Sequence, residues 1–181
     1  QVHLMRAESD VILVGIGTVE ADDPELNCRL PGLEDRSPVR VVLDREAKLP
    51  MMSKLALSAR SLPLYVAVGP EASPVRRSSL EMLGVRFLAT ETHQGRIALP
   101  ELLEDLAGQG FSTVLVEGGA ATAKTFLEDD VVDRIALFLG PNPIGDGGIR
   151  SPITPETIPD GFRLVREARY GLDRYSEWVR I

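Results

Sequence analysis

The chain has few of the residues that build covalent or metal-based cross-links. Cys28 is the only cysteine among 181 residues, so an intrachain disulfide and a four-cysteine zinc site are both excluded. This usage indicates a cytosolic protein, and we expect no metal site. Histidine is also scarce. His3 near the chain start and His93 in a polar stretch belong to no catalytic motif, so a histidine general base is not indicated.

Long apolar runs and excess positive charge are missing as well. No run approaches the roughly 18 residues of a membrane-spanning helix, and the N-terminus has no signal-peptide pattern. The net charge of −7 argues against nucleic acid or an anionic membrane as a partner. It leaves open a phosphorylated small ligand, because two or three converging arginines make a local positive site. The length fits one domain, residues 1–181.

The apolar runs alternate with stretches that carry helical signals, which is typical of an α/β fold. Strands are expected over 11–16, 39–43, 64–68, 113–117 and 134–139. Helices are expected over 53–59, 74–83, 100–107 and 120–128. The tail alternates over 162–169 and 174–181, as an antiparallel hairpin would. We therefore expect a mostly parallel central sheet flanked by helices, with a C-terminal antiparallel hairpin.

The stretch from Arg6 to Arg29 is the most informative part of the chain. The continuous apolar run 11–14 suits a strand that is covered on both faces. Gly15 and Gly17 let the chain turn at the carboxyl end of this strand, where open α/β sheets bind their ligands.

Charged side chains then follow this turn. Asp22, Asp23 and the two arginines could gather there to bind a polar phosphorylated molecule. The alternative is a solvated acidic loop, with the arginines in surface salt bridges to Glu8, Asp22 or Asp23.

A second candidate site begins at Glu117-Gly118-Gly119, between an expected strand and an expected helix. Glycine permits close backbone approach, and the free N–H groups of a helix start favour phosphate. The alternative is a tight turn without a ligand. Arg45 follows the strand 39–43 and could reach the 2′-phosphate that separates NADPH from NADH, or it could be a solvated cap.

Four ordered segments carry a resemblance to a known family. They are RAESDVILVGIGTVEADDPELNCR at 6–29, PVRVVLD at 38–44, VLVEGGAATAKTFLEDDVVD at 114–133 and GPNPIGDGG at 140–148. Together they resemble the reductase domain of the bifunctional deaminase-reductase of riboflavin biosynthesis, which has a dihydrofolate-reductase-like fold. The resemblance covers most of the chain.

The resemblance implies an NADPH-dependent reduction of 5-amino-6-(5-phosphoribosylamino)uracil to its ribitylamino product, in a homodimer. It implies substrate binding by Arg6, Asp22, Leu26, Arg29 and Glu117, with Asp22 acting at the reacting sugar. It also implies cofactor binding by Thr18, Gly119, Ala120, Ala121, Thr122, Ala123, Lys124 and Thr125. The glycine-rich segment 145–148 resembles a family loop near the cofactor.

Two departures from the family leave alternatives open. The histidine-glutamate pair and the Pro-Cys-x-x-Cys motif of the deaminase domain do not occur, so this chain can carry only the reduction. The chain also starts at Gln1, inside the family's first helix, without the strand that precedes it. We expect it to be part of a longer protein, which could hold a deaminase domain. The alternatives are a reductase of the undeaminated diaminopyrimidine and a nucleotide-binding or dimerisation module without turnover.

Overall fold

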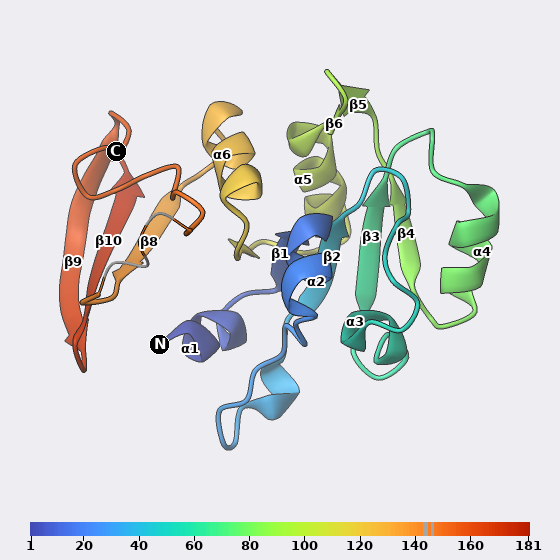
Figure 1. The fold of residues 1–181 in the computed structure, drawn as a ribbon, viewed down its shortest axis with the longest axis horizontal. Helices are drawn as coiled ribbons and strands as arrows, with labels where there is room; N and C mark the ends of the chain where they lie inside the picture. The colour runs from blue at the N-terminus through green and yellow to red at the C-terminus, as the bar shows by residue number, and fades with distance from the viewer. Residues whose placement is uncertain (143–144, 146) are drawn as a thin grey trace. The chain divides into compact units, whose positions relative to one another are not determined.

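The structure is a computed structural model that describes residues 1–142, 145 and 147–181. The chain forms two compact units, Gln1–Thr122 and Ala123–Ile181, each with a main sheet of its own (Figure 1). No helix among the described residues is both long and apolar enough to cross a bilayer.

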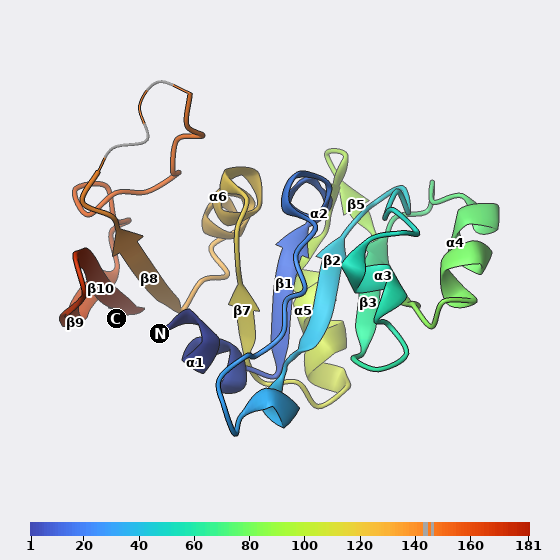
Figure 2. The same ribbon diagram turned by 60° about the horizontal axis from the view of Figure 1, so that its bottom comes forward.

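The first unit is built on a five-stranded parallel sheet (Figure 2). Most of its strands are short, mainly apolar runs, which suits a sheet that is covered on both faces. In spatial order they are β4 (Arg86–Ala89), β3 (Leu64–Val68), β2 (Val39–Leu43), β1 (Val11–Gly15) and β7 (Val114–Val116). All neighbours pair in parallel, so their carboxyl ends share one edge of the sheet.

Helices connect these strands. They are α1 (Val2–Ala7), α2 (Ile16–Asp22), the 3-10 helix η1 (Glu34–Arg36), α3 (Lys54–Leu57), α4 (Pro74–Glu81) and α5 (Leu99–Gly108). The α3 helix begins after Ser53, whose hydroxyl caps it by accepting a hydrogen bond from the Ala56 N–H. A small hairpin of β5 (Thr92–His93) and β6 (Arg96–Ile97) precedes α5.

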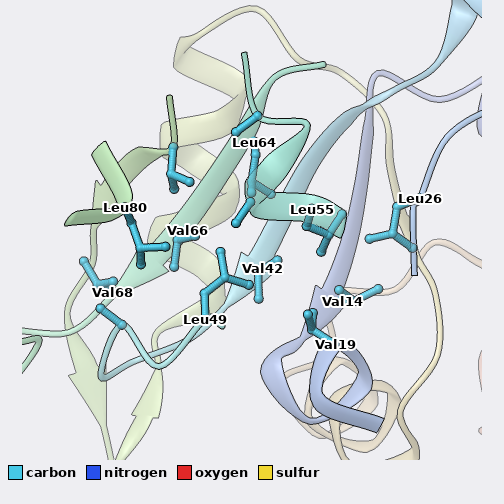
Figure 3. Packing of buried hydrophobic residues seen from close by; sticks show 14 of the residues in the cluster. Val14, Val19, Leu26, Val42, Leu49, Leu55, Leu64, Val66, Val68 and Leu80 are labelled. Carbon is cyan, nitrogen blue, oxygen red and sulfur yellow. The ribbon is translucent and has the colours of Figure 1, made fainter. Parts of the chain in front are cut away.

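The core of the first unit follows the two-residue period of the strands. Ile12, Val14 and Val42 point into the main cluster, where residues of α3 and α4 such as Leu55 and Leu80 pack against them (Figure 3). The alternate strand residues are equally buried. They face the other side of the sheet, where the apolar stripe of α5 is also buried: Leu99, Leu102 and Leu106.

One carboxylate joins β1 to the segment that leads into β7. The Asp10 carboxylate accepts hydrogen bonds from the backbone N–H groups of Ser112 and Thr113, at 2.8 and 3.0 Å, and from both hydroxyls. The donors, first of all the Ser112 N–H, hold the pKa of Asp10 below its ordinary value of 3.8.

Replacing Asp10 with alanine is therefore expected to lower the free energy of unfolding by about 1 kcal/mol at neutral pH. The expected loss is small because Asp10 is exposed and water screens its interactions. Since the folded-state pKa lies below the unfolded one, the stabilisation is complete above about pH 4 and is lost as the pH falls through the folded pKa. Urea unfolding at a series of pH values measures this. A difference from wild type that persists at low pH, or an equal effect of the exposed control Asp105→Ala, would contradict it.

The second unit begins inside α6 (Ala120–Glu128) and continues to an antiparallel sheet in the order β8-β10-β9. Its strands are β8 (Arg134–Leu139), β9 (Phe162–Tyr170) and β10 (Asp173–Arg180). Phe138, Tyr170 and Tyr175 form an aromatic cluster with ring centroids 4.8 to 6.4 Å apart. Burial and a hydrogen bond to Glu177 raise the pKa of Tyr175 to about 12.

The expected architecture is confirmed, and the strands 39–43, 64–68 and 134–139 have the expected bounds. The helix α2, the 3-10 helix η1, the strand β4 and the β5–β6 hairpin were not expected. Residues 16–22 form α2 rather than a turn, because Gly15 caps a helix there, and β4 and the β5–β6 hairpin had no strong apolar pattern. In α6 the buried residue is Phe126, whereas Ala123 and Leu127 are only partly covered. The expectation for residues 145–148 falls partly outside the described residues.

Candidate functional site

The central feature of the candidate site is a two-pronged ion pair. Arg6 at the end of α1 donates from Nε and Nη2 to the two carboxylate oxygens of Glu117, at 2.8 and 2.6 Å. Its third nitrogen, Nη1, donates to the backbone carbonyl of Asn27 at 2.9 Å. Both charged side chains are mostly buried, with 14% and 19% of their surface exposed. Arg6 thus fixes the orientation of the Glu117 carboxylate.

The sheet places Glu117 beside β1. Val116 lies opposite Leu13 in the parallel ladder, and the Glu117 N–H extends the ladder by donating to the Leu13 carbonyl at 3.0 Å. The Arg6–Glu117 pair therefore depends on the register between β1 and β7. The ion-pair partner of Arg6 is thus Glu117 and none of the three alternatives, Glu8, Asp22 and Asp23.

A glycine turn follows Glu117 directly. Gly118 and Gly119 have φ values of 70° and 63°, in the left-handed region that favours glycine. A Cβ atom on Gly119 would lie 3.0 Å from the Thr18 hydroxyl and 3.4 Å from that of Thr122. The starts of α2 and α6 thus approach each other, with one threonine hydroxyl from each beside the glycine backbone.

The donors at this turn suit an anion. The first N–H groups of α6 have no partner within their own helix, and the helix dipole adds partial positive charge. Residues 118–125 include no carboxylate. These observations fit the phosphates of a dinucleotide, the group that the family resemblance implies. The last three residues expected to bind it, Ala123, Lys124 and Thr125, lie further along α6, in the second unit.

The loop after α2 has two left-handed residues that are not glycine. Asp23 (φ 41°) accepts a hydrogen bond from the first N–H of α3, that of Lys54, at 2.9 Å. Leu26 (φ 54°) buries its side chain in the core, with 3% of the residue exposed. Such conformations are costly and cluster at functional sites. Only the backbone of Leu26 is left to contact a substrate, whereas Asp22 ends α2 with its side chain exposed.

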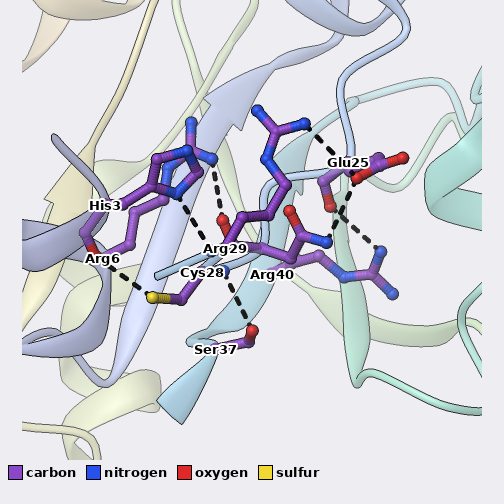
Figure 4. Close-up of polar contacts among 8 residues, drawn as sticks. His3, Arg6, Glu25, Cys28, Arg29, Ser37 and Arg40 are labelled. Atoms are coloured by element: carbon purple, nitrogen blue, oxygen red, sulfur yellow. Dashed lines mark hydrogen bonds and ion pairs between the residues drawn. The ribbon is translucent and has the colours of Figure 1, made fainter. Parts of the chain in front are cut away.

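Arg29 differs from Arg6 in its surroundings (Figure 4). Its side chain is 64% exposed and makes a loose ion pair with Glu25 at 3.9 Å, while its backbone N–H donates to His3 Nδ1. Two arginines were expected to bind a phosphate. Because the guanidinium of Arg6 is held by Glu117 and Asn27, that of Arg29 is the one available to a ligand.

An open cavity of about 470 Å³ lies against the same loop, lined by Asn27, Cys28, Arg29, Glu34, Asp35, Ser37, Ser61 and Leu62. It includes neither Glu117 nor the glycine turn. The carboxylates of Glu34 and Asp35 would repel a phosphate there, so we do not assign the site to this cavity. Among the described residues, no group of three or more metal-ligating side chains gathers.

The sequence reasoning missed Asn27, Glu46 and Glu71. Asn27 supplies the carbonyl that Arg6 contacts, and its side-chain oxygen is buried without a partner among the described residues. Glu46 and Glu71 pair with Arg45, each at 2.9 Å. Glu71 follows β3 as Arg45 follows β2, so the rule that ligands bind at the carboxyl ends of strands could have found it.

Comparisons with known proteins extend these observations. Residues 1–173 match the family described as the RibD C-terminal domain. The riboflavin biosynthesis protein RibD of Bacillus amyloliquefaciens is 36% identical over 90% of this chain and 42% of its own length. The chain therefore spans less than half of that relative.

An archaeal relative is covered more fully. The 2,5-diamino-6-ribosylamino-4(3H)-pyrimidinone 5′-phosphate reductase of Archaeoglobus fulgidus is 33% identical over 93% of this chain and 75% of its own length. A solved deaminase/5-amino-6-(5-phosphoribosylamino)uracil reductase of Thermotoga maritima aligns with a TM-score of 0.74 and 25% identity, over 99% of this chain and 48% of that one. The chain belongs to the RibD C-terminal domain family.

Proposed function

We propose that this chain reduces 5-amino-6-(5-phosphoribosylamino)uracil with NADPH, as a reductase of riboflavin biosynthesis. The observation that carries the proposal is the Arg6–Glu117 ion pair placed immediately before the glycine turn of α6. A carboxylate fixed in this way can recognise a polar substrate beside a dinucleotide that is held by the turn. Membership of the RibD C-terminal domain family supports the same reaction.

Each part of the site has a role in this proposal. When bound, the reduced nicotinamide would supply a hydride to C1′ of the ribose, and the ring oxygen O4′ that leaves C1′ would take up a proton. Glu117 accepts hydrogen bonds from the pyrimidine amine or the ribose hydroxyls, and Arg29 binds the 5′-phosphate. Asp22, with the Leu26 backbone nearby in the loop, orients a sugar hydroxyl or relays a proton. The proposed reaction thus needs no nucleophile, because the protein supplies binding and alignment.

The cofactor is held by the segment from Gly119 to Thr125, together with Thr18 and Arg45. Backbone N–H groups and the Thr18 and Thr122 hydroxyls provide neutral donors, and Lys124 provides charge. Lys124 lies 3.5 Å from Glu128, a loose exposed pair that phosphate could replace.

A second substrate is favoured by one observation. The Archaeoglobus relative, covered over 75% of its length, is named for the undeaminated diaminopyrimidine.

The experiment that tests the proposal measures NADPH oxidation with the uracil and the diaminopyrimidine in parallel. Turnover of the uracil supports the proposal, and turnover of the diaminopyrimidine alone moves the assignment to that substrate. Cofactor binding without oxidation of either would contradict a reductase and favour a binding module.

Replacing Gly119 with alanine is expected to weaken NADPH binding at least ~10-fold. The new Cβ would lie 3.0 Å from the Thr18 hydroxyl, and the left-handed backbone would be strained. The expected stability cost is only about 1 kcal/mol, so a loss of binding would not reflect unfolding. Gly108→Ala is the matched control, because a Cβ there meets nothing within 4 Å. Calorimetric titration measures the affinity, and equal affinities of the two variants would argue against a phosphate site at this turn.

A further inference from the structure

Arg45 lies in a small charge-balanced cluster beyond the ends of β2 and β3. Its Nη2 is 2.9 Å from a Glu46 carboxylate oxygen, and its Nε is 2.9 Å from one of Glu71. Lys48 contacts the other oxygen of Glu46 at 2.8 Å. Two positive and two negative side chains therefore meet here, with 34% to 56% of each side chain exposed.

The cluster lies on the same edge of the sheet as the glycine turn. Arg45 follows β2, Glu71 follows β3, and Gly119 follows β7, all at carboxyl ends of parallel strands. With neighbouring strands about 4.8 Å apart, β2 lies roughly 10 Å from β7. An extended dinucleotide that is held by its phosphates at the turn can span this distance along the edge.

The cluster fits against the backbone at residue 69 only because this residue is a glycine. A Cβ on Gly69 would lie 2.6 Å from a Glu71 carboxylate oxygen and 3.0 Å from Cγ of Arg45. The Gly69 N–H donates to the Arg45 carbonyl at 2.9 Å, which ties the two strand ends together. The position of Glu71 against Arg45 is thus built into the backbone.

We propose that Arg45, Glu46 and Glu71 bind the adenosine ribose of the cofactor and that Glu71 makes the site accept NADH as well as NADPH. This inference rests on the proposed function. An arginine accommodates a 2′-phosphate, whereas a carboxylate accepts a hydrogen bond from a 2′-hydroxyl. Here both types of group share one site. A 2′-phosphate must compete with two carboxylates for the Arg45 guanidinium, and the charge-balanced cluster offers it no net positive charge, so the gain that Arg45 alone would provide is largely cancelled.

The test is the dissociation constant of each nucleotide, measured by calorimetric titration of the whole chain. For wild type, we expect the constants for NADPH and NADH to agree within about tenfold. Glu71→Gln should tighten NADPH binding by about tenfold and leave NADH binding equal or weaker, because the guanidinium is released and a hydroxyl acceptor is lost. Arg45→Gln should weaken NADPH binding by a similar factor and change NADH binding little.

Glu104→Gln, an exposed carboxylate on α5, is the control for net charge. Affinities of Glu71→Gln that change no more than those of this control would overturn the inference, as would a strong NADPH preference in wild type. If wild type binds both nucleotides but Glu71→Gln leaves the ratio of the two dissociation constants unchanged, the proposed function stands and this inference is wrong. Binding of neither nucleotide would overturn both.

Discussion

Replacing Glu117 with alanine is expected to lower the free energy of unfolding by about 2–4 kcal/mol and to abolish reduction. The change leaves the Arg6 guanidinium, 14% exposed, with no carboxylate partner. Breaking a fully buried ion pair by removing one partner costs about 3–5 kcal/mol, and the remaining exposure of this pair reduces that value. Activity falls because the carboxylate proposed to contact the substrate is gone. Urea unfolding and steady-state kinetics measure the two effects separately.

A double variant separates the structural from the functional role of this pair. Arg6→Met combined with Glu117→Leu removes both charges, so no unpaired charge remains and much of the stability should return. Reduction should not return, because the polar contact to the substrate is still missing. Glu8→Ala, an exposed carboxylate just after α1, is the control. A Glu117→Ala protein with wild-type kcat/KM would exclude Glu117 from the site, and one with wild-type stability would contradict the importance of the ion pair for the fold.

Replacing Arg40 with methionine is expected to cost about 2–4 kcal/mol of stability, although the volume is nearly kept. Arg40 is 1% exposed and donates to the Ser58 hydroxyl at 2.7 Å and to the carbonyls of Glu25, Ser58, Leu62 and Pro63. Methionine removes a donor from the Glu25 and Leu62 carbonyls and from the Ser58 hydroxyl, and each acceptor left without a donor costs about 1–3 kcal/mol unless water reaches it. The Ser58 and Pro63 carbonyls keep backbone N–H donors. Burial lowers the pKa of Arg40 to about 10, so the guanidinium stays charged at neutral pH.

Arg40 also connects the fold to the candidate site. Its contact with the Glu25 carbonyl, at 3.4 Å, holds the loop that runs from Asp22 at the end of α2 to Arg29 (Figure 4). We therefore expect Arg40→Met to raise KM more than it lowers kcat, measured below the unfolding transition. Arg36→Met, an exposed arginine in η1, is the control. A stability equal to that of the control would show that water satisfies the acceptors and that the contacts of Arg40 contribute little.

Local patterns predicted the scaffold of the site better than its contacts. The run 11–14 predicted a buried strand, and the glycines after Glu117 predicted the turn that opens α6. Both depend on residues close in the sequence. The sequence suggested Leu26 as a substrate contact without indicating that its side chain would be buried in the core. That outcome depends on the left-handed backbone at Leu26, which no adjacent glycine signalled.

The sequence by itself determined the α/β class, most strand and helix positions, the glycine turn and the family, because apolar period, turn chemistry and ordered motifs are local properties. Only the tertiary structure decided which charges meet. Arg6 and Glu117 are 111 residues apart, and the register of β1 against β7 brings them together. Likewise, the parallel pairing of β2 with β3 places their carboxyl ends side by side and brings Arg45 to Glu71. Ion pairs need contact within a few ångströms, and for residues distant in sequence only the tertiary packing of helices and strands provides it.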